Sequence, residues 1–458
     1  MTTTISYVAD EAQSWALANG LLMGSTHAPI TLKPSKIPKS AYEKTCELAY
    51  DFNVLIDRVS RDHEFLSQTL SSVALVDDFI NHLLNILRVI NQTPGKKPSC
   101  LGLHRCDYMF ERDQSGRIHP FQVEINTISA AFGCLTTLVT DLHQYLISRC
   151  WNRTNVLPSN SASQKIVDSL AHAVEHYRTH WWFEKNREPH ILMVVQPNEK
   201  NSVDQRLIEY QLWDRYGLRL IRRSLRDIST SIIVSENDEL FIDNHLIALV
   251  YYRAGYKPDD YESEDHWQSV LLMEQSHAIK CPSVGYHLAG SKKVQQTLAL
   301  PGVLERFVEP ERAERLRSCQ VGLWGLEKDD LDTQTIINTA IADPDQFVLK
   351  PQREGGGNNL WGLDLANYLQ TASVMDRSAY ILMQRIRPFQ QHGVLMRNGQ
   401  VTHGLCCNEL GIYSSYLSDG EKVYLDQVNG HLLRTKLADQ NEGGVATGYA
   451  VLDSPDFT

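Results

Sequence analysis

The chain has 458 residues, of which 42% are hydrophobic and 22% are charged. This composition is ordinary for a folded protein, and at about 100–200 residues per domain the length predicts two to four domains. Its 44 lysines and arginines against 55 aspartates and glutamates give a net charge of −11. Such a balance opposes binding to nucleic acid or to anionic membranes, so any phosphate ligand must be held by basic residues that gather locally.

The nine cysteines form no Cys-x-x-Cys pair, which gives no indication of a disulfide framework or a zinc ribbon. The N-terminal residues contain no basic stretch followed by an apolar run, and no run of about 18 apolar residues occurs elsewhere. We therefore expect a cytoplasmic protein with neither a membrane nor a nucleic acid as partner.

Apolar residues recur at helical spacing through the first hundred residues, which predicts packed helices there. Strand-like patterns follow at residues 101–110 and 121–126, separated by turn residues at 114–116, and together they predict a hairpin. Helical patterns come next, at about 134–150 and 161–179.

The middle of the chain alternates strand and helix patterns after a proline-containing break at residues 187–189. We expect strands at 191–195, 218–221 and 246–252 and a helix at 203–216, which is typical of a compact α/β unit. This pattern predicts three parts, namely residues 1–187, an α/β domain at 188–290, and residues 291–458.

The strongest local signal is a strand pattern at residues 347–349 that ends in Lys350 and leads into the glycines of residues 355–357. Bare glycine backbone can approach phosphate oxygens, Lys350 and Arg353 add positive charge, and Glu354 offers an oxygen of the kind Mg²⁺ prefers. The segment lacks the P-loop pattern and the third glycine of a Rossmann fingerprint. Taken alone, it could equally be an ordinary glycine-rich turn.

Polar residues alternate along the predicted hairpin. Glu124 and Asn126 are two apart, so on a strand they share a face and place two oxygen ligands on one wall. Arg105 and Asp107 are also two residues apart on the preceding predicted strand, so they too share a face. A solvated strand edge is the alternative interpretation.

A third signal lies near the C-terminus, where Arg434 and Lys436 share one strand face and a glycine-rich segment follows at 442–448. Two cations beside a flexible loop could form a lid over an anionic intermediate, although a mobile surface loop is the alternative. Lys292 lies at a predicted helix start, where the helix dipole also favours anions.

Together, residues 124–129, 289–296, 350–359 and 431–436 resemble eukaryotic glutathione synthetase, a family of ATP-grasp ligases, and the similarity runs along nearly the whole chain. The resemblance implies an α/β fold with α+β elements, namely a permuted ATP-grasp fold with an inserted α/β substrate-binding domain and a Gly-rich lid. It also implies a homodimer that joins γ-glutamylcysteine to glycine, with ATP converting the cysteinyl carboxylate into an acyl phosphate.

The resemblance further implies roles for individual residues. Mg²⁺ would be held by Glu124, Asn126 and Glu354. ATP would be bound by Lys292, Lys350, Glu354, Gly355, Gly356, Gly357, Asn358, Asn359, Trp361, Met383, Gln384, Arg385, Ile386, Glu409, Lys436 and Glu442. The dipeptide and glycine would be bound by Arg105, Ser129, Ala130, Ala131, Glu199, Lys200, Asn201, Gln205, Arg253, Ala254, Gly255, Tyr256, Arg434, Val445 and Ala446. The catalytic residues would be Arg434, which faces the reacting carboxylate, Lys350 and Lys292.

The sequence departs from the family pattern at several of these positions. Ala131 and Lys200 replace a serine and an arginine near the dipeptide, and Trp361 replaces a tyrosine near the nucleotide. Two other functions remain open. One is a ligase for another acceptor such as β-alanine or serine, and the other is a catalytically silent paralogue that acts as a binding partner subunit.

Overall fold

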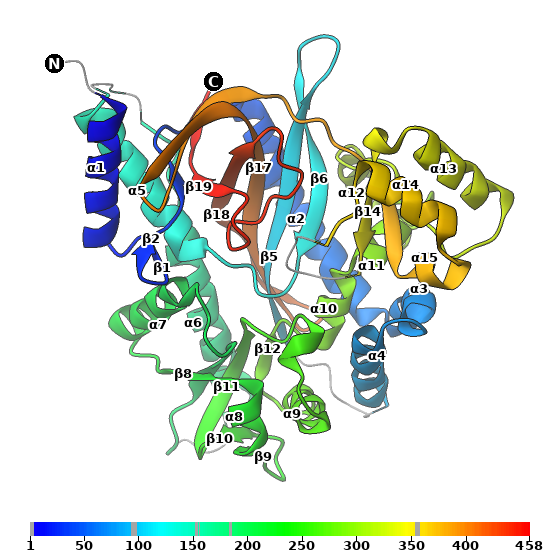
Figure 1. Ribbon diagram of the computed structural model, residues 1–458. Coiled ribbons are helices and arrows are strands. Elements are labelled where there is room, and N and C mark those ends of the chain that lie inside the picture. Colours follow the sequence, from blue (N-terminus) through cyan, green and yellow to red (C-terminus); the bar gives the residue numbers. More distant parts are fainter. Residues whose placement is uncertain (1–3, 93–98, 152–153, 155, 183–185, 353–357) are drawn as a thin grey trace.

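The computed structural model describes residues 4–92, 99–151, 154, 156–182, 186–352 and 358–458. Residues 353–357 of the predicted phosphate loop lie outside the described residues. The described chain forms a 13-stranded mixed sheet covered by helices, with a smaller three-stranded sheet to one side (Figure 1). This arrangement confirms the predicted mixed α/β fold class.

The centre of the large sheet is built from long antiparallel strands. Along its main path lie β16 (Gln391–Arg397), β3 (Ile30–Thr31), β19 (Val451–Asp453), β18 (Val423–Leu437), β17 (Gln400–Ser418), β5 (Cys100–Arg112), β12 (Ile279–Cys281), β11 (His245–Tyr252), β10 (Leu240–Ile242) and β9 (Ile232–Val234). Off this path, β6 (Ile118–Asn126) pairs with β5, and β7 (His190–Val194) pairs with β11 and with β8 (Leu220–Arg223). The predicted hairpin is therefore confirmed as β5 and β6.

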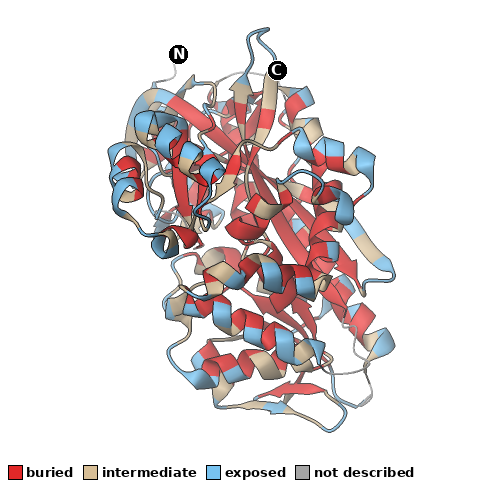
Figure 2. Ribbon diagram, turned by 90° about the vertical axis from the view of Figure 1, so that its right-hand side faces the viewer, coloured by how far each residue is buried: buried red, intermediate tan, exposed pale blue. Residues whose placement is uncertain are grey.

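Two apolar cores lie on opposite faces of this sheet, because neighbouring strand residues point to opposite sides. On β18, Leu433 joins the core that contains α2, whereas Leu432 joins the core that contains α5 and α6. On β17, Ile412 joins the core that contains α2, and Tyr413 joins the core that contains α5 and α6. The buried strands and the inward sides of the helices are red in Figure 2.

The helices follow from apolar spacing and from side-chain caps. In α2, Leu48, Phe52, Leu55 and Val59 are buried at helical intervals, and Asp62 then caps α3 by accepting a hydrogen bond from a backbone N–H in its first turn. The α-helices are α1 (Ile5–Ala18), α2 (Lys39–Arg61), α3 (His63–Ala74), α4 (Asp78–Asn91), α5 (Gly133–Arg149), α6 (Ala162–His180), α7 (Ser202–Tyr216), α8 (Leu225–Ser229), α9 (Glu264–Gln275), α10 (Val284–Ala289), α11 (Lys292–Leu298), α12 (Pro310–Arg317), α13 (Leu331–Ala342), α14 (Gly362–Thr371) and α15 (Val374–Ser378). Short 3₁₀ turns span Pro258–Asp260, Leu304–Arg306 and Pro344–Gln346.

The smaller sheet carries the predicted phosphate-side strand. It comprises β13 (Leu323–Gly325), β15 (Tyr380–Gln384) and β14 (Phe347–Pro351), in that order. One face packs on α13 and α14 through Leu349 and Leu382, while the other packs on the β5–β6 hairpin through Val348 and Met383. This second contact brings the end of β14 against β6.

The prediction of helices alone for the first hundred residues is incomplete. Short strands occur there as well, namely β1 (Leu22–Met23), β2 (Thr26–His27), β3 and β4 (Ser35–Ile37). β4 pairs with the C-terminal β20 (Pro455–Phe457), and β3 pairs with β16 and β19. Segments of two or three residues carry no readable alternation. β1 and β2 pair with each other, whereas the partners of β3 and β4 lie hundreds of residues away along the chain.

The strands of the middle region continue the same sheet, since Lys280 of β12 pairs with Cys100 of β5. The domain boundaries at 187/188 and 290/291 therefore stay predictions. Among the described residues, no helix combines the length and apolar character needed to span a membrane.

Candidate active site

Two cavities, each of about 440 Å³, adjoin beside the β5–β6 hairpin. This volume lies within the range of about 300–1,000 Å³ that is usual for small-molecule sites. The first lies between β6, the segment 196–201, β18 and the glycine-rich segment 441–447. The second lies over the ends of β14 and β15. Both are lined by Lys350, Trp361 and Lys436, so these residues form the wall between the two cavities.

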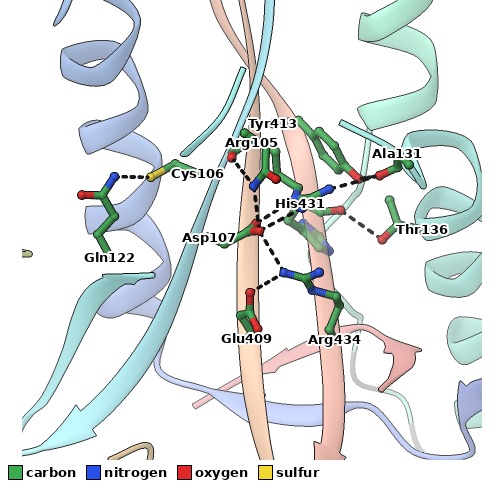
Figure 3. A network of polar contacts seen from close by, with 11 residues as sticks. Arg105, Cys106, Asp107, Gln122, Ala131, Thr136, Glu409, Tyr413, His431 and Arg434 are labelled. Carbon is green, nitrogen blue, oxygen red and sulfur yellow. Dashed lines mark hydrogen bonds and ion pairs between the residues drawn. The ribbon is translucent and has the colours of Figure 1, made fainter. Parts of the chain in front are cut away.

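Asp107 is the centre of a polar network that holds Arg105 and Arg434 at the wall of the first cavity (Figure 3). Its fully buried carboxylate accepts hydrogen bonds from Arg105 Nε at 2.7 Å and Nη2 at 2.9 Å, from Arg434 Nη2 at 2.8 Å and from Asn126 Nδ2 at 3.0 Å. Burial by itself would raise the pKa of Asp107, but the two guanidinium groups outweigh it and the pKa is lowered. One carboxylate thus holds two arginines in place.

Gly411 of β17 pairs with Asp107 across the sheet. A Cβ atom at this position would lie 2.5 Å from Asp107 Oδ1 and 2.7 Å from the Cδ of Arg105. Because real Cβ atoms do not approach other atoms so closely, the arginine–aspartate pair requires glycine here.

Glu409 adds a second acidic partner for Arg434. The two residues are directly opposite on β17 and β18, and Arg434 donates a hydrogen bond to the Glu409 carboxylate. Burial raises the pKa of Glu409, and Asp107 and Glu124 raise it further, against the opposing effect of Arg434. The guanidinium is therefore fixed between two carboxylates.

Positive charge gathers around Glu124 on the cavity wall. Lys292 Nζ, in the first turn of α11, is 4.0 Å from Glu124 Oε2, and Lys350 Nζ donates a hydrogen bond to the carbonyl of Val123 at 3.1 Å. Burial would raise the pKa of Glu124, but the two lysines lower it. An acidic protein thus concentrates basic side chains at the place where a polyphosphate could bind.

The side-chain amide of Asn126 has a defined orientation. Its Nδ2 donates to the Arg105 carbonyl at 3.2 Å and to Asp107 at 3.0 Å. The oxygen at the other end of the amide is therefore available to the cavity, whose lining includes both Asn126 and Glu124. This donor set matches the oxygen ligands that Mg²⁺ prefers.

The glycine-rich segment is tied to the second cavity by several contacts. Glu442 accepts hydrogen bonds from Trp361 Nε1 at 3.1 Å and from Asn359 Nδ2 at 3.3 Å. Asn441 accepts one from Lys436 Nζ at its carbonyl, at 2.7 Å, and one from Arg385 at its side chain, at 3.0 Å. These contacts close the segment over the wall that the two cavities share.

The far end of the first cavity is organised by Asp204, which is fully buried on α7. Its carboxylate accepts backbone hydrogen bonds from Phe132 at 3.0 Å and Cys134 at 2.9 Å, and it pairs with Arg253 at 3.2 Å. Ser129 has a positive φ of 53° and donates a hydrogen bond to the carbonyl of Arg253 at 3.0 Å. Asp204 therefore joins three segments that are distant in sequence.

The structure brings most of the sequence-predicted residues together. The first cavity is lined by Arg105, Glu124, Asn126, Ser129, Ala131, Glu199, Lys200, Asn201, Arg253, Tyr256, Lys292, Lys350, Asn358, Asn359, Trp361, Glu409, Arg434, Lys436, Glu442, Val445 and Ala446, and the second by Lys350, Trp361, Met383, Gln384, Arg385, Ile386 and Lys436. Ala130, Gln205, Ala254 and Gly255 line neither cavity, and Glu354, Gly355, Gly356 and Gly357 lie outside the described residues.

Several residues of this region were absent from the predicted site. Asp107 shares a strand face with Arg105, so the two-residue spacing already indicates it. Asp204 and Gly411 carry no such signal, because their partners lie far away along the chain. The side chain of Asn441 likewise meets Arg385, which is 56 residues away.

Comparisons with known proteins place this geometry in context. A sequence model described as the ATP-binding domain of eukaryotic glutathione synthase matches residues 2–457. Glutathione synthetase from Dictyostelium discoideum is 39% identical over 484 residues, covering 99% of both chains. The human enzyme, named glutathione synthetase, is 39% identical and covers 98% of this chain and 96% of its own. A chloroplastic glutathione synthetase from Solanum lycopersicum is 40% identical and covers 98% of this chain and 84% of its own.

Among solved structures, a glutathione synthetase-like effector from Globodera pallida superposes with a TM-score of 0.79 at 22% identity. The match covers 100% of this chain and 98% of the other, which supports the fold. With the family model spanning almost every residue and relatives near 40% identity along their length, this chain belongs to the eukaryotic glutathione synthase family.

Proposed function

We propose that this chain is a glutathione synthetase that joins γ-glutamylcysteine to glycine and converts ATP to ADP and phosphate. Family membership supports the reaction, and the observation that carries it here is the pair of adjoining cavities separated by Lys350, Trp361 and Lys436. The second cavity has the strand-end setting of a nucleotide site, and the first is large and polar enough for the dipeptide and glycine.

Mg²⁺ would be held by Glu124 and Asn126, together with Glu354 from outside the described residues. The amide orientation of Asn126 and the lowered pKa of Glu124 both fit an oxygen-ligated divalent cation. Bound there, the ion would neutralise charge on the ATP phosphates during phosphoryl transfer.

The proposed reaction has two steps and needs no protein nucleophile. In the first step, a cysteinyl carboxylate oxygen of the dipeptide attacks the γ-phosphorus of ATP, the bond to the β-phosphate oxygen breaks, and ADP leaves. In the second step, the glycine amine attacks the acyl carbon, phosphate leaves with that carboxylate oxygen, and the amine loses a proton. Lys292, Lys350 and Arg434 would stabilise the negative charge in both steps.

The closed segment 441–447 would protect the acyl phosphate from water. Val445 is 2% exposed and, with Ala446, lines the first cavity behind Gly443 and Gly444. Small side chains at this wall leave room for glycine as acceptor, which is why we favour glycine over β-alanine or serine.

We also propose a homodimer in the cytosol. Two plant relatives, from Solanum lycopersicum and Arabidopsis thaliana, are named chloroplastic, so the compartment is tested by imaging a fluorescent fusion in cells of the source organism. Light scattering coupled to size-exclusion chromatography tests the dimer, for which the measured molar mass should be twice that of the chain.

The direct test of the function incubates the protein with γ-glutamylcysteine, ATP and MgCl₂ and offers glycine, β-alanine and serine in competition. Mass spectrometry should identify glutathione as the main peptide product, formed in equal amounts with ADP. A main product that contains β-alanine or serine would change the acceptor assignment. Binding of ATP and dipeptide without any ligation would favour the silent paralogue.

A further inference from the structure

We propose that Arg222, which lies outside the predicted site, is a positioning residue for the dipeptide because it fixes the side-chain amide of Gln205. This inference rests on the proposed function and concerns how the enzyme holds γ-glutamylcysteine. It is carried by one hydrogen bond and by a group of buried polar atoms without partners.

Gln205 lies in α7 and is fully buried. Its Oε1 accepts a hydrogen bond from Arg222 Nη2 of β8 at 2.5 Å. Its Nε2 has no hydrogen-bond partner among the described residues. A buried amide nitrogen without an acceptor is costly, so an acceptor supplied by a ligand is the natural completion.

Arg222 dictates which end of the amide remains unpaired. A guanidinium group has only donors, and if the Gln205 amide were flipped its NH₂ group would face the Arg222 N–H groups. That arrangement places donor against donor and loses the hydrogen bond. Arg222 therefore keeps the Gln205 nitrogen facing away from β8, where it can donate a hydrogen bond to another acceptor.

Two neighbouring side chains, Asn201 and Arg253, also have polar atoms without hydrogen-bond partners among the described residues. Asn201 lies four residues before Gln205, hence on the same side of α7, and it lines the first cavity. Both polar side-chain atoms of Asn201 lack a partner among the described residues, as does Nε of the buried Arg253. Asn201 and Arg253 thus bring unpartnered polar atoms to the lining of the first cavity, while Gln205, which lines neither cavity, adds a further one in the same buried cluster.

The electrostatics of this region favour an acidic partner. Arg222 is partly buried, and its pKa is lowered first by that burial and then by Arg206 and Arg253, with Glu209 and Glu199 acting in the opposite sense. Arg434 and Lys292, which are proposed for the reacting carboxylate, are held instead by Asp107 and Glu124. We therefore assign this end to the carboxylate of the dipeptide that is remote from the reacting centre.

The test compares steady-state kinetics of Arg222→Met, Arg222→Lys and wild type. Arg222→Met removes the donors and keeps an apolar stem, so KM for γ-glutamylcysteine should rise about tenfold, the size expected for one buried hydrogen bond. The values of kcat and of KM for ATP and glycine should stay within about twofold. Arg222→Lys keeps one donor and should recover part of the loss.

The next residue on the strand offers a matched control. Arg223 pairs with Asp243 at 2.7 Å, and both side chains are more than a third exposed. Arg223→Met removes the same charge from β8 and should leave KM for the dipeptide unchanged. Circular dichroism and thermal melting of each variant identify any general loss of folding, which would affect all kinetic constants together.

A double-variant cycle tests whether Arg222 acts through Gln205. In a Gln205→Ala background, Arg222→Met should add little to the rise in KM, whereas two independent effects would multiply and overturn the inference. An unchanged KM in Arg222→Met would also overturn it. If wild type performs no ligation, the proposed function fails, and calorimetric titration with γ-glutamylcysteine then tests the same tenfold ratio on Kd.

Discussion

Replacing Asp107 with asparagine tests the network at the centre of the site. The wild-type carboxylate accepts four hydrogen bonds, two from Arg105, one from Arg434 and one from Asn126. Asparagine keeps one acceptor oxygen, and its NH₂ group would face guanidinium donors. The buried Arg105 and the partly exposed Arg434 would lose their shared counter-charge, although Arg434 keeps Glu409.

The magnitude follows from the burial of the pair. Asp107 has a fully buried side chain and that of Arg105 is 7% exposed, so the interaction is shielded from water. Removing one partner of such a pair costs about 3–5 kcal/mol, because the other charge remains buried without compensation. Activity should fall as well, since Arg105 and Arg434 are the proposed contacts to dipeptide and reacting carboxylate.

The assay is urea unfolding at pH 7, followed by both circular dichroism and tryptophan fluorescence, together with the rate of ADP release. Asp168→Asn is the matched control, because Asp168 pairs with Arg215 at 2.5 Å while each side chain is about a third exposed. A pair of that kind contributes about 0–1 kcal/mol. If Asp107→Asn unfolds at the same urea concentration as Asp168→Asn and keeps its activity, the network does not organise the site.

The pH dependence of stability gives an independent check on Asp107. Its pKa is lower in the folded chain than the unfolded value of about 3.9, so ionisation stabilises the folded state above that pH. This stabilisation is lost as the pH falls from the unfolded pKa towards the lower folded pKa. Wild type should therefore lose more stability than Asp107→Asn as the pH falls below about 4, and parallel profiles would contradict the lowered pKa.

Three further predictions concern the cavities. Glu124→Gln should reduce kcat by about 10²–10³ with little change in melting temperature, because it removes a metal ligand, and normal turnover would remove that assignment. Gly411→Ala should impair activity and lower the melting temperature through its clash with Asp107, and a crystal structure with an unmoved network would refute this. The Val445→Leu, Ala446→Pro double variant should change the ratio of glycine to β-alanine products by about 1–3 kcal/mol, and an unchanged ratio in an active enzyme would place the acceptor pocket elsewhere.

Sequence patterns predicted the local parts of the site. The two-residue spacing placed Glu124 and Asn126 on one wall, and both line the first cavity. Lys292 begins α11, and Lys350 lies near the end of β14, as expected from the helix and strand patterns. These features depend on a few neighbouring residues, so periodicity is enough to find them.

The parts that the sequence patterns missed depend on the meeting of distant segments. Asp204 reaches a backbone N–H of Phe132 that is 72 residues away, and Trp361 reaches Glu442 across 81 residues. In the sequence alone, an acidic helix residue such as Asp204 cannot be distinguished from an ordinary exposed polar residue, because its partners are not known. The same reason explains why the short strands β3 and β4 were not predicted.

The most direct measurement of the central claim is oxygen transfer from the dipeptide. γ-Glutamylcysteine carrying ¹⁸O in both oxygens of its cysteinyl carboxylate is incubated with ATP, Mg²⁺ and glycine, and the products are analysed by mass spectrometry. Ligation through an acyl phosphate predicts one ¹⁸O atom in the released phosphate and one in the new peptide bond of glutathione. Phosphate without ¹⁸O, or label in AMP, would contradict the proposed mechanism.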